Sequence, residues 1–181
     1  MCAVACTTSS CAIASAATAK AISCATCTAD QKACPLRVVD LFGGTTPTPE
    51  QLLEAEEEDL RACGLSGRKT EYVRDLATHV ISGELELDRL DQLADEEVIE
   101  EIVAVRGLGQ WTAEMFLLFH LQRPDVLSGG DLGIRKAIQI EYGLGEMPAP
   151  KRVIEIGEPW RPYRSLASLY LWESLAAVPV D

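Results

Sequence analysis

The chain has 181 residues, a length that suits one domain, or one domain with a tail, and allows a substantial buried core. Its formal net charge is −12, which disfavours an extensive nucleic-acid interface because such binding depends largely on Lys and Arg. No apolar run long enough to span a bilayer is evident in the part with a helical pattern, so a membrane span is not expected. The acidic excess is uneven: residues 37–101 carry 6 basic and 18 acidic side chains, whereas residues 102–181 carry 8 and 9.

Residues 1–34 differ in composition from the rest of the chain. They are mostly Ala, Ser, Thr and Cys, hold six of the seven cysteines, and show neither helical nor strand periodicity. Cys24 and Cys27 have C-x-x-C spacing, but no second pair or His cluster accompanies them, so we expect no metal bound by side chains. The segment also lacks the basic and apolar regions of a signal peptide. We therefore treat residues 1–34 as an atypical, poorly packed segment, and a reducing cytoplasm is the simplest setting.

From residue 35 onward the sequence reads as successive helices without a convincing strand pattern. Thr48 before Pro49 predicts a helix start, and Ser66 and Gly83 predict the two ends of a later helix. Asp95 is expected to cap the helix that follows. The predicted helices of this half are residues 36–42, 49 to about 64, 67–82 and 95–105.

The second half continues the same pattern. Residues 111–121 are apolar nearly all round, which predicts a buried central helix. Further helices are predicted at residues 131–142, in a short stretch ending near Glu158, and at residues 162–176. The fold class is therefore all-α: residues 35–181 should form a multi-helix globular domain.

Gly107-Leu108-Gly109 separates two of these helical patterns. Two glycines around one apolar residue allow a tight turn whose N–H groups point outward, and Leu108 can anchor the turn between the helices. These N–H groups lie at the start of the next helix, where the helix dipole favours an anion. Such a helix-hairpin-helix can hold a nucleic-acid phosphate without reading a base. Taken alone, however, Gly-x-Gly between helices is often only a turn.

Asp131 lies twenty residues after Trp111, in Ser128-Gly129-Gly130-Asp131. Because it precedes a helical run, its simplest role is that of a helix N-cap. The hairpin and an aspartate at this spacing form a much more specific combination than either feature alone.

Residues 37–175 closely resemble the helix-hairpin-helix DNA glycosylase superfamily, and the nearest branch is the 3-methyladenine DNA glycosylase II family. The resemblance covers roughly three quarters of the chain, in order and with similar intervals. The matching segments are Phe42-Gly43-Gly44, Pro47-Thr48-Pro49, Gly64-Leu65-Ser66, Arg68-Lys69, the hairpin with Trp111-Thr112-Ala113, Gly130-Asp131, Trp160 to Ser165, and Leu171-Trp172.

The resemblance implies roles for individual residues. Asp131 matches the catalytic aspartate, which stabilises positive charge on the sugar as the N-glycosidic bond breaks. Trp111 and Trp172 match aromatic positions of the base pocket, where they would attract a cationic alkylated purine, and Met115 stands where some members have a pocket tyrosine. For both tryptophans, plain core packing is the alternative. The residues implied to hold DNA backbone phosphate are Gly107, Leu108, Gly109 and Thr112.

Two differences from other branches bear on the reaction. Bifunctional members carry a nucleophilic lysine at the position of Trp111, so this chain is expected to cleave the glycosidic bond without cutting the strand. Iron–sulfur members have four cysteines after the catalytic aspartate, whereas no cysteine here lies beyond Cys63. We expect no cofactor, apart from a monovalent cation at the hairpin carbonyls. Residues 1–34 lack the motif that fills the space left by a flipped base.

The expected function is therefore that of a monofunctional glycosylase that removes alkylated purines, such as 3-methyladenine, from double-stranded DNA by base flipping. The alternative is a DNA-binding module that retains the hairpin but cannot excise bases. A monomer is expected, located in the cytoplasm if the source is bacterial.

Overall fold

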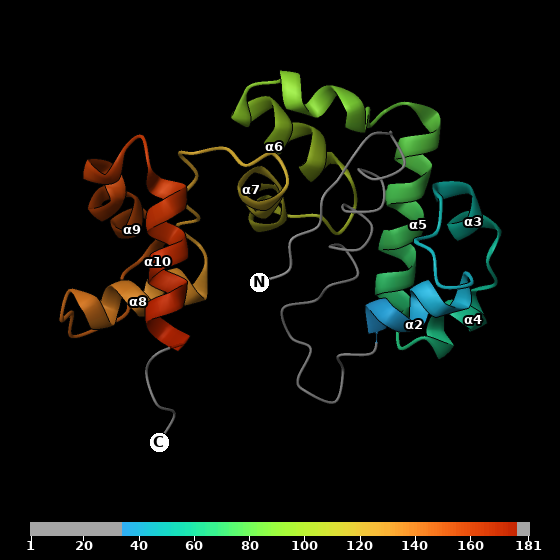
Figure 1. The fold of residues 1–181 in the computed structure, drawn as a ribbon, viewed down its shortest axis with the longest axis horizontal. Coiled ribbons are helices and arrows are strands. Elements are labelled where there is room, and N and C mark those ends of the chain that lie inside the picture. The colour runs from blue at the N-terminus through green and yellow to red at the C-terminus, as the bar shows by residue number, and fades with distance from the viewer. Residues whose placement is uncertain (1–33, 177–181) are drawn as a thin grey trace. The chain divides into compact units, whose positions relative to one another are not determined.

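The computed structural model describes residues 34–176, which form helices joined by loops, with no strand among them (Figure 1). The all-α prediction is confirmed. The chain divides into two compact units, Met1–Gly109 and Gln110–Asp181. The predicted segment 1–34, with its C-x-x-C pair, lies almost wholly outside the described residues.

The first unit contains five α-helices and a 3₁₀ turn in its described part. The elements are α2 (Cys34–Leu41), α3 (Pro49–Glu54), α4 (Glu57–Ala62), α5 (Gly67–Ser82), η2 (Leu87–Gln92) and α6 (Asp95–Ala104).

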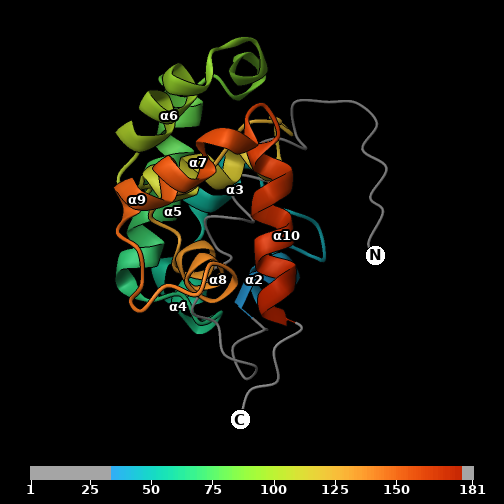
Figure 2. The ribbon, with the colours of Figure 1, turned by 90° about the vertical axis from the view of Figure 1, so that its left-hand side faces the viewer.

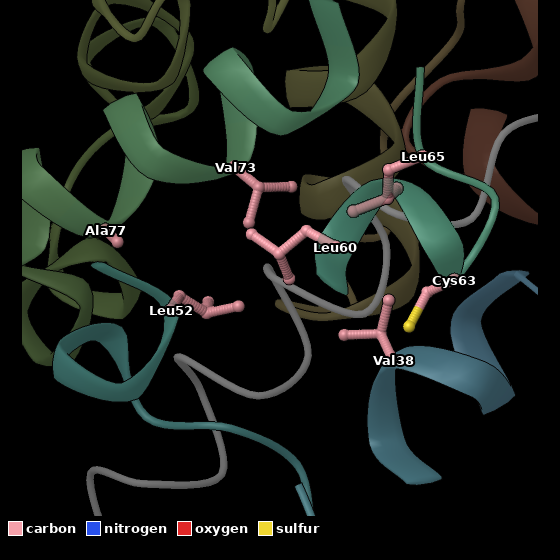
Figure 3. Close-up of a cluster of buried hydrophobic side chains, with 7 residues drawn as sticks. All are labelled: Val38, Leu52, Leu60, Cys63, Leu65, Val73 and Ala77. Atoms are coloured by element: carbon pink, nitrogen blue, oxygen red, sulfur yellow. The ribbon is translucent and has the colours of Figure 1, made fainter. Parts of the chain in front are cut away.

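Helix α5 is the longest helix in the described part of the first unit, and α3 and α4 pack against it (Figure 1). Ser66 caps its start by accepting from the Lys69 N–H, and Gly83 ends it in the left-handed conformation at φ 76°, as predicted. In Figure 3 the side chains of Val38 and Cys63 point toward one another, and Leu60 lies beside Val73. One buried hydrophobic cluster of the unit consists of Val38, Leu52, Leu60, Cys63, Leu65, Val73 and Ala77.

The prediction of one helix from residue 49 to about 64 is wrong. The chain is extended at Ala55 and Glu56, so α3 and α4 are separate helices. Arg74 of α5 donates to the main-chain carbonyls of Leu53 and Ala55, which fixes the break.

The predicted N-cap at Asp95 is also displaced by one residue. Asp95 begins α6, and Ala94 precedes it with its N–H bound to the Glu97 carboxylate at 2.9 Å.

The second unit holds the remaining helices. They are α7 (Gln110–Phe119), α8 (Leu132–Glu141), α9 (Pro150–Gly157), the 3₁₀ turn η3 (Glu158–Trp160) and α10 (Arg164–Ala176).

Helix α10 packs across α8 (Figure 2), and the two share a buried core with α9. This core consists of Leu127, Ile134, Ala137, Ile138, Val153 and Leu171. Residues 113–118 of α7 are all buried, as predicted, but Trp111 and Phe119 near its two ends are 41% and 48% exposed, so the helix is buried only in part. No helix in the described range 34–176 has both the length and the apolar character needed to cross a membrane.

Candidate active site

The hairpin turn, residues 105–109, ends the first unit. Gly107 has φ 87°, in the region that favours glycine, and the Leu108 N–H donates to the Val105 carbonyl at 3.1 Å. Leu108 is half-buried, whereas Gly107 and Gly109 are exposed. The tight turn predicted from Gly-Leu-Gly is therefore present.

Helix α5 supports this turn through three side chains that sequence reasoning did not single out. The Tyr72 ring lies so close to Gly107 that a Cβ there would overlap it. The Asp75 carboxylate accepts from the Arg106 main-chain N–H at 2.9 Å, and the Arg106 guanidinium pairs with Glu71 at 3.0 Å. Glu71, Tyr72 and Asp75 occupy one side of α5, and their spacing gave no signal because such patterns are common on solvated helices.

In the second unit, Asp131 is the N-cap of α8, as its place before a helical run predicted. Its Oδ1 accepts from the Ile134 main-chain N–H at 2.8 Å, and the residue is only 9% exposed. The carboxylate therefore lies at the positive end of a helix dipole, which favours its negative charge.

Two indole groups complete the surroundings of this carboxylate. The Nε1 of Trp111 donates to Asp131 Oδ2 at 2.7 Å, and the Nε1 of Trp172 donates to Oδ1 at 3.0 Å. Both residues were expected from their aromatic faces, but their N–H groups were not expected to bind the aspartate. Each carboxylate oxygen thus accepts from at least one neutral donor, which fixes its orientation without a cationic partner.

The two rings are otherwise placed differently. Trp172 stacks on Phe119 with ring centroids 5.8 Å apart, and Gly133 permits this position because a Cβ there would be 3.0 Å from the indole. Trp111 is 41% exposed, so plain core packing does not describe it. Met115 is 3% exposed within α7, and its place in a base pocket stays a prediction.

Hydrogen bonds from α10 hold the loop of residues 123–131, which ends at Asp131. Arg164 donates to both carboxylate oxygens of Asp125, at 2.6 and 3.0 Å, and Arg161 adds a contact at 2.6 Å. Bonding to the Arg164 guanidinium lowers the pKa of Asp125.

The Ser165 hydroxyl holds the same loop through two main-chain groups: it donates to the Arg123 carbonyl and accepts from the Val126 N–H at 2.9 Å. The segment Trp160 to Ser165, noted only as part of the resemblance, therefore holds this loop.

Helix α7 holds the same loop from another side. Glu114 is 9% exposed and accepts from the Ser128 hydroxyl and from the Gln110 amide, the latter at 3.0 Å. A cavity of about 360 Å³ adjoins these residues and is lined by Trp111 and Gly130 as well. Glu114 was missed, although a carboxylate within an apolar helix is itself a signal.

The described residues include no group of three His, Cys, Asp or Glu side chains arranged to hold a metal ion. Thr112 lies in the first turn of α7 and is half-buried. Its predicted phosphate contact stays a prediction.

Residues 14–162 match the family described as HhH-GPD superfamily base excision DNA repair protein. The chain belongs to this superfamily. The resemblance carried by the hairpin and Asp131 is thereby confirmed at the level of the family, and the match begins within the atypical N-terminal segment.

Individual relatives agree with this assignment. The chain is 37% identical over 129 residues to the putative DNA-3-methyladenine glycosylase YfjP of Bacillus subtilis, covering 71% of this chain and 45% of the relative. It is 36% identical over 132 residues to DNA-3-methyladenine glycosylase 1 of Schizosaccharomyces pombe, covering 72% of this chain and 58% of the relative. The chain thus spans about half the length of the curated relatives it matches.

Two solved structures have the same fold. The DNA-3-methyladenine glycosidase of Bacillus halodurans superposes with a TM-score of 0.78 at 39% identity, over 90% of this chain and 75% of that one. The 3-methyladenine DNA glycosylase Mag1 of Schizosaccharomyces pombe, in complex with abasic DNA, gives a TM-score of 0.80 at 32% identity, over 87% and 78%.

Proposed function

We propose that this protein is a DNA glycosylase that excises alkylated purines, of the 3-methyladenine type, from double-stranded DNA. The observation that carries the proposal is the buried Asp131 carboxylate, bound by two indole N–H groups at the start of α8. The names of the relatives, which are DNA-3-methyladenine glycosylases, support the choice of substrate.

Asp131 would act electrostatically. As the bond between the sugar C1′ and the base nitrogen breaks, its electron pair leaves with the base and positive charge develops on the sugar. A fixed carboxylate facing that cation lowers the barrier because it needs no reorganisation during the reaction. Water then adds to C1′ and loses a proton, which leaves an abasic site in an intact strand.

The tryptophans fit a cationic leaving group. An alkylated purine already carries positive charge and departs as a neutral base, so the reaction needs no strong general acid. The ring faces of Trp111 and Trp172 would attract the cation by about 0.5–2 kcal/mol each, while their N–H groups hold Asp131. Each tryptophan thus has two separable roles.

We infer that no covalent intermediate forms, because Trp111 stands where bifunctional members place a lysine nucleophile. Borohydride reduction during turnover should therefore trap no protein–DNA adduct, and the product strand should stay uncut. A trapped adduct would show that another amine acts as nucleophile and would contradict the assignment to this branch.

DNA backbone phosphate would be held by the N–H groups of the turn and the following helix start, through Gly107, Leu108, Gly109 and Thr112. A monovalent cation at the hairpin carbonyls would support this contact, and no other cofactor is needed. Because the phosphate contacts are few and the chain is acidic, we expect a short DNA footprint and a weak dependence of affinity on salt. We also expect the protein to act as a monomer.

The deciding experiment measures release of methylated bases from alkylated double-stranded DNA by the purified full chain. We expect release of 3-methyladenine. Binding to DNA without any release would instead favour the second candidate, a hairpin module that binds but does not excise. That candidate rests on the absence from residues 1–34 of the motif that fills the space of a flipped base.

A further inference from the structure

Glu114 is a buried carboxyl group that the proposed reaction does not use. It lies on α7, three residues after Trp111, so the two side chains are one helical turn apart. Burying a carboxyl group is costly unless hydrogen bonds satisfy it. Here the Ser128 hydroxyl and the Gln110 amide provide them.

The contact with Ser128 bears directly on Asp131. The Asp131 main-chain N–H donates to the Ser128 carbonyl at 3.2 Å, so the position of Ser128 sets the start of the turn that carries the aspartate. Between them stand Gly129 and Gly130, which allow many backbone conformations unless the loop is held. Gly129 also passes close to α9, since a Cβ there would lie 2.8 Å from the Pro150 carbonyl oxygen.

Helix α7 therefore holds this loop at two points: Glu114 binds Ser128, and Trp111 binds Asp131. We propose that Glu114 is a positioning residue that fixes the direction of the Asp131 carboxylate through Ser128. This inference rests on the proposed function for its kinetic consequence, but the positional effect can be measured without activity.

The first readout is spectroscopic. The chain has three tryptophans, so a ¹⁵N-labelled protein gives three indole N–H signals, which single Trp→Phe variants assign. Glu114→Leu and Ser128→Ala should both shift the Trp111 signal, because its acceptor moves, and leave the Trp160 signal in place. Glu114→Gln retains an oxygen acceptor for Ser128 and should shift the Trp111 signal least. A matched control is Ser174→Ala, which removes a hydroxyl that donates to the Leu171 carbonyl of its own helix.

The second readout is single-turnover excision on alkylated DNA. Glu114→Leu and Ser128→Ala should each slow excision about tenfold while the Kd for DNA changes less than twofold. The double variant should be no slower than either single variant, because both remove the same contact. Glu114→Gln should stay within about threefold of the wild type.

Two results would overturn the inference. One is an unchanged Trp111 signal in both Glu114→Leu and Ser128→Ala. The other is multiplication of the two rate losses in the double variant, which would show that Glu114 and Ser128 affect excision independently of one another. If Glu114→Leu does not fold, Ser128→Ala carries the test through the same two readouts. A wild type that releases no base refutes the proposed function, whereas the indole signals still decide the positional role.

Discussion

The hairpin turn at residues 105–109 and the loop at residues 123–131 are held in place by different kinds of contact. The hairpin turn depends on main-chain geometry: Gly107 adopts φ 87° beneath the Tyr72 ring, and the ion pair beside it, Arg106 with Glu71, is exposed. An exposed pair of this kind contributes little to stability. The loop instead depends on buried side chains, such as Ser128 and Ser165, which are 1% and 8% exposed.

The difference follows from what each region is proposed to do. A phosphate can be bound by main-chain N–H groups, so the hairpin needs the correct turn, which Tyr72 and Asp75 support, rather than a side chain that contacts the phosphate. A carboxylate that must face a developing cation has to be held in one direction, which takes several hydrogen bonds. Substitutions should therefore affect DNA affinity in the hairpin and the rate of excision in the loop.

The largest expected effect is at Asp131. Asp131→Asn keeps the shape and the N-cap but removes the negative charge that would face the sugar. Excision should fall at least a hundredfold, consistent with the loss of a preorganised electrostatic contact, while the Kd for DNA stays within a few fold. Single-turnover release of methylated base and fluorescence anisotropy measure the two quantities. Excision close to the wild-type rate would remove Asp131 from the mechanism.

The second-largest expected effect is a loss of DNA affinity when the hairpin turn is altered. In Gly107→Ala the new Cβ would overlap the Tyr72 ring and the residue would have an unfavourable positive φ. We expect DNA affinity at least tenfold weaker. The matched control is Gly143→Ala, where φ is also positive, at 61°, but no atom lies within 4 Å of the added Cβ. Equal loss of affinity in the two variants would show that general strain, and not this turn, is responsible.

The third prediction separates the two roles of Trp172. Trp172→Phe retains an aromatic ring beside Phe119 but removes the N–H that donates to Asp131. Excision should slow about tenfold, equivalent to about 1.4 kcal/mol of transition-state stabilisation. The Kd for DNA containing the alkylated base should change little, because the ring remains. A large loss of affinity for DNA with an unchanged rate of excision would show that the N–H of Trp172 does not contribute to the reaction.

The sequence allowed the helices and their caps to be predicted because these depend on local patterns. Ser66 and Gly83 mark the ends of α5, and Asp131 marks the start of α8. The break at Ala55 could not be predicted, since it depends on Arg74, which is nineteen residues away.

The site was predicted in part. The position of Asp131 and the aromatic character of Trp111 and Trp172 came from spacing and from the resemblance. The hydrogen bonds from both indoles, and the contact of Glu114 with Ser128, depend on how α7 and α10 pack around the loop. No local pattern encodes such contacts. The only available signal was an acidic residue in an otherwise apolar helix.

The smallest expected effect concerns the far end of the same loop. Hydrogen bonding to Arg164 lowers the pKa of Asp125 in the folded state. The charged Asp125 therefore stabilises the fold fully above its unfolded-state pKa of about 3.9, and this stabilisation is lost as the pH falls through the lower folded-state pKa. Asp125→Asn should lower the Tm by about 3–12 °C at pH 7, since hydrogen bonds to charged groups contribute about 1.5–3 kcal/mol. The difference in Tm between this variant and the wild type should shrink as the pH falls below about 4.

The variant Glu146→Gln, at an exposed position, serves as the control and should leave the Tm nearly unchanged at both pH values. A gap for Asp125→Asn that stays constant with pH would show that the charge of Asp125 does not hold the loop.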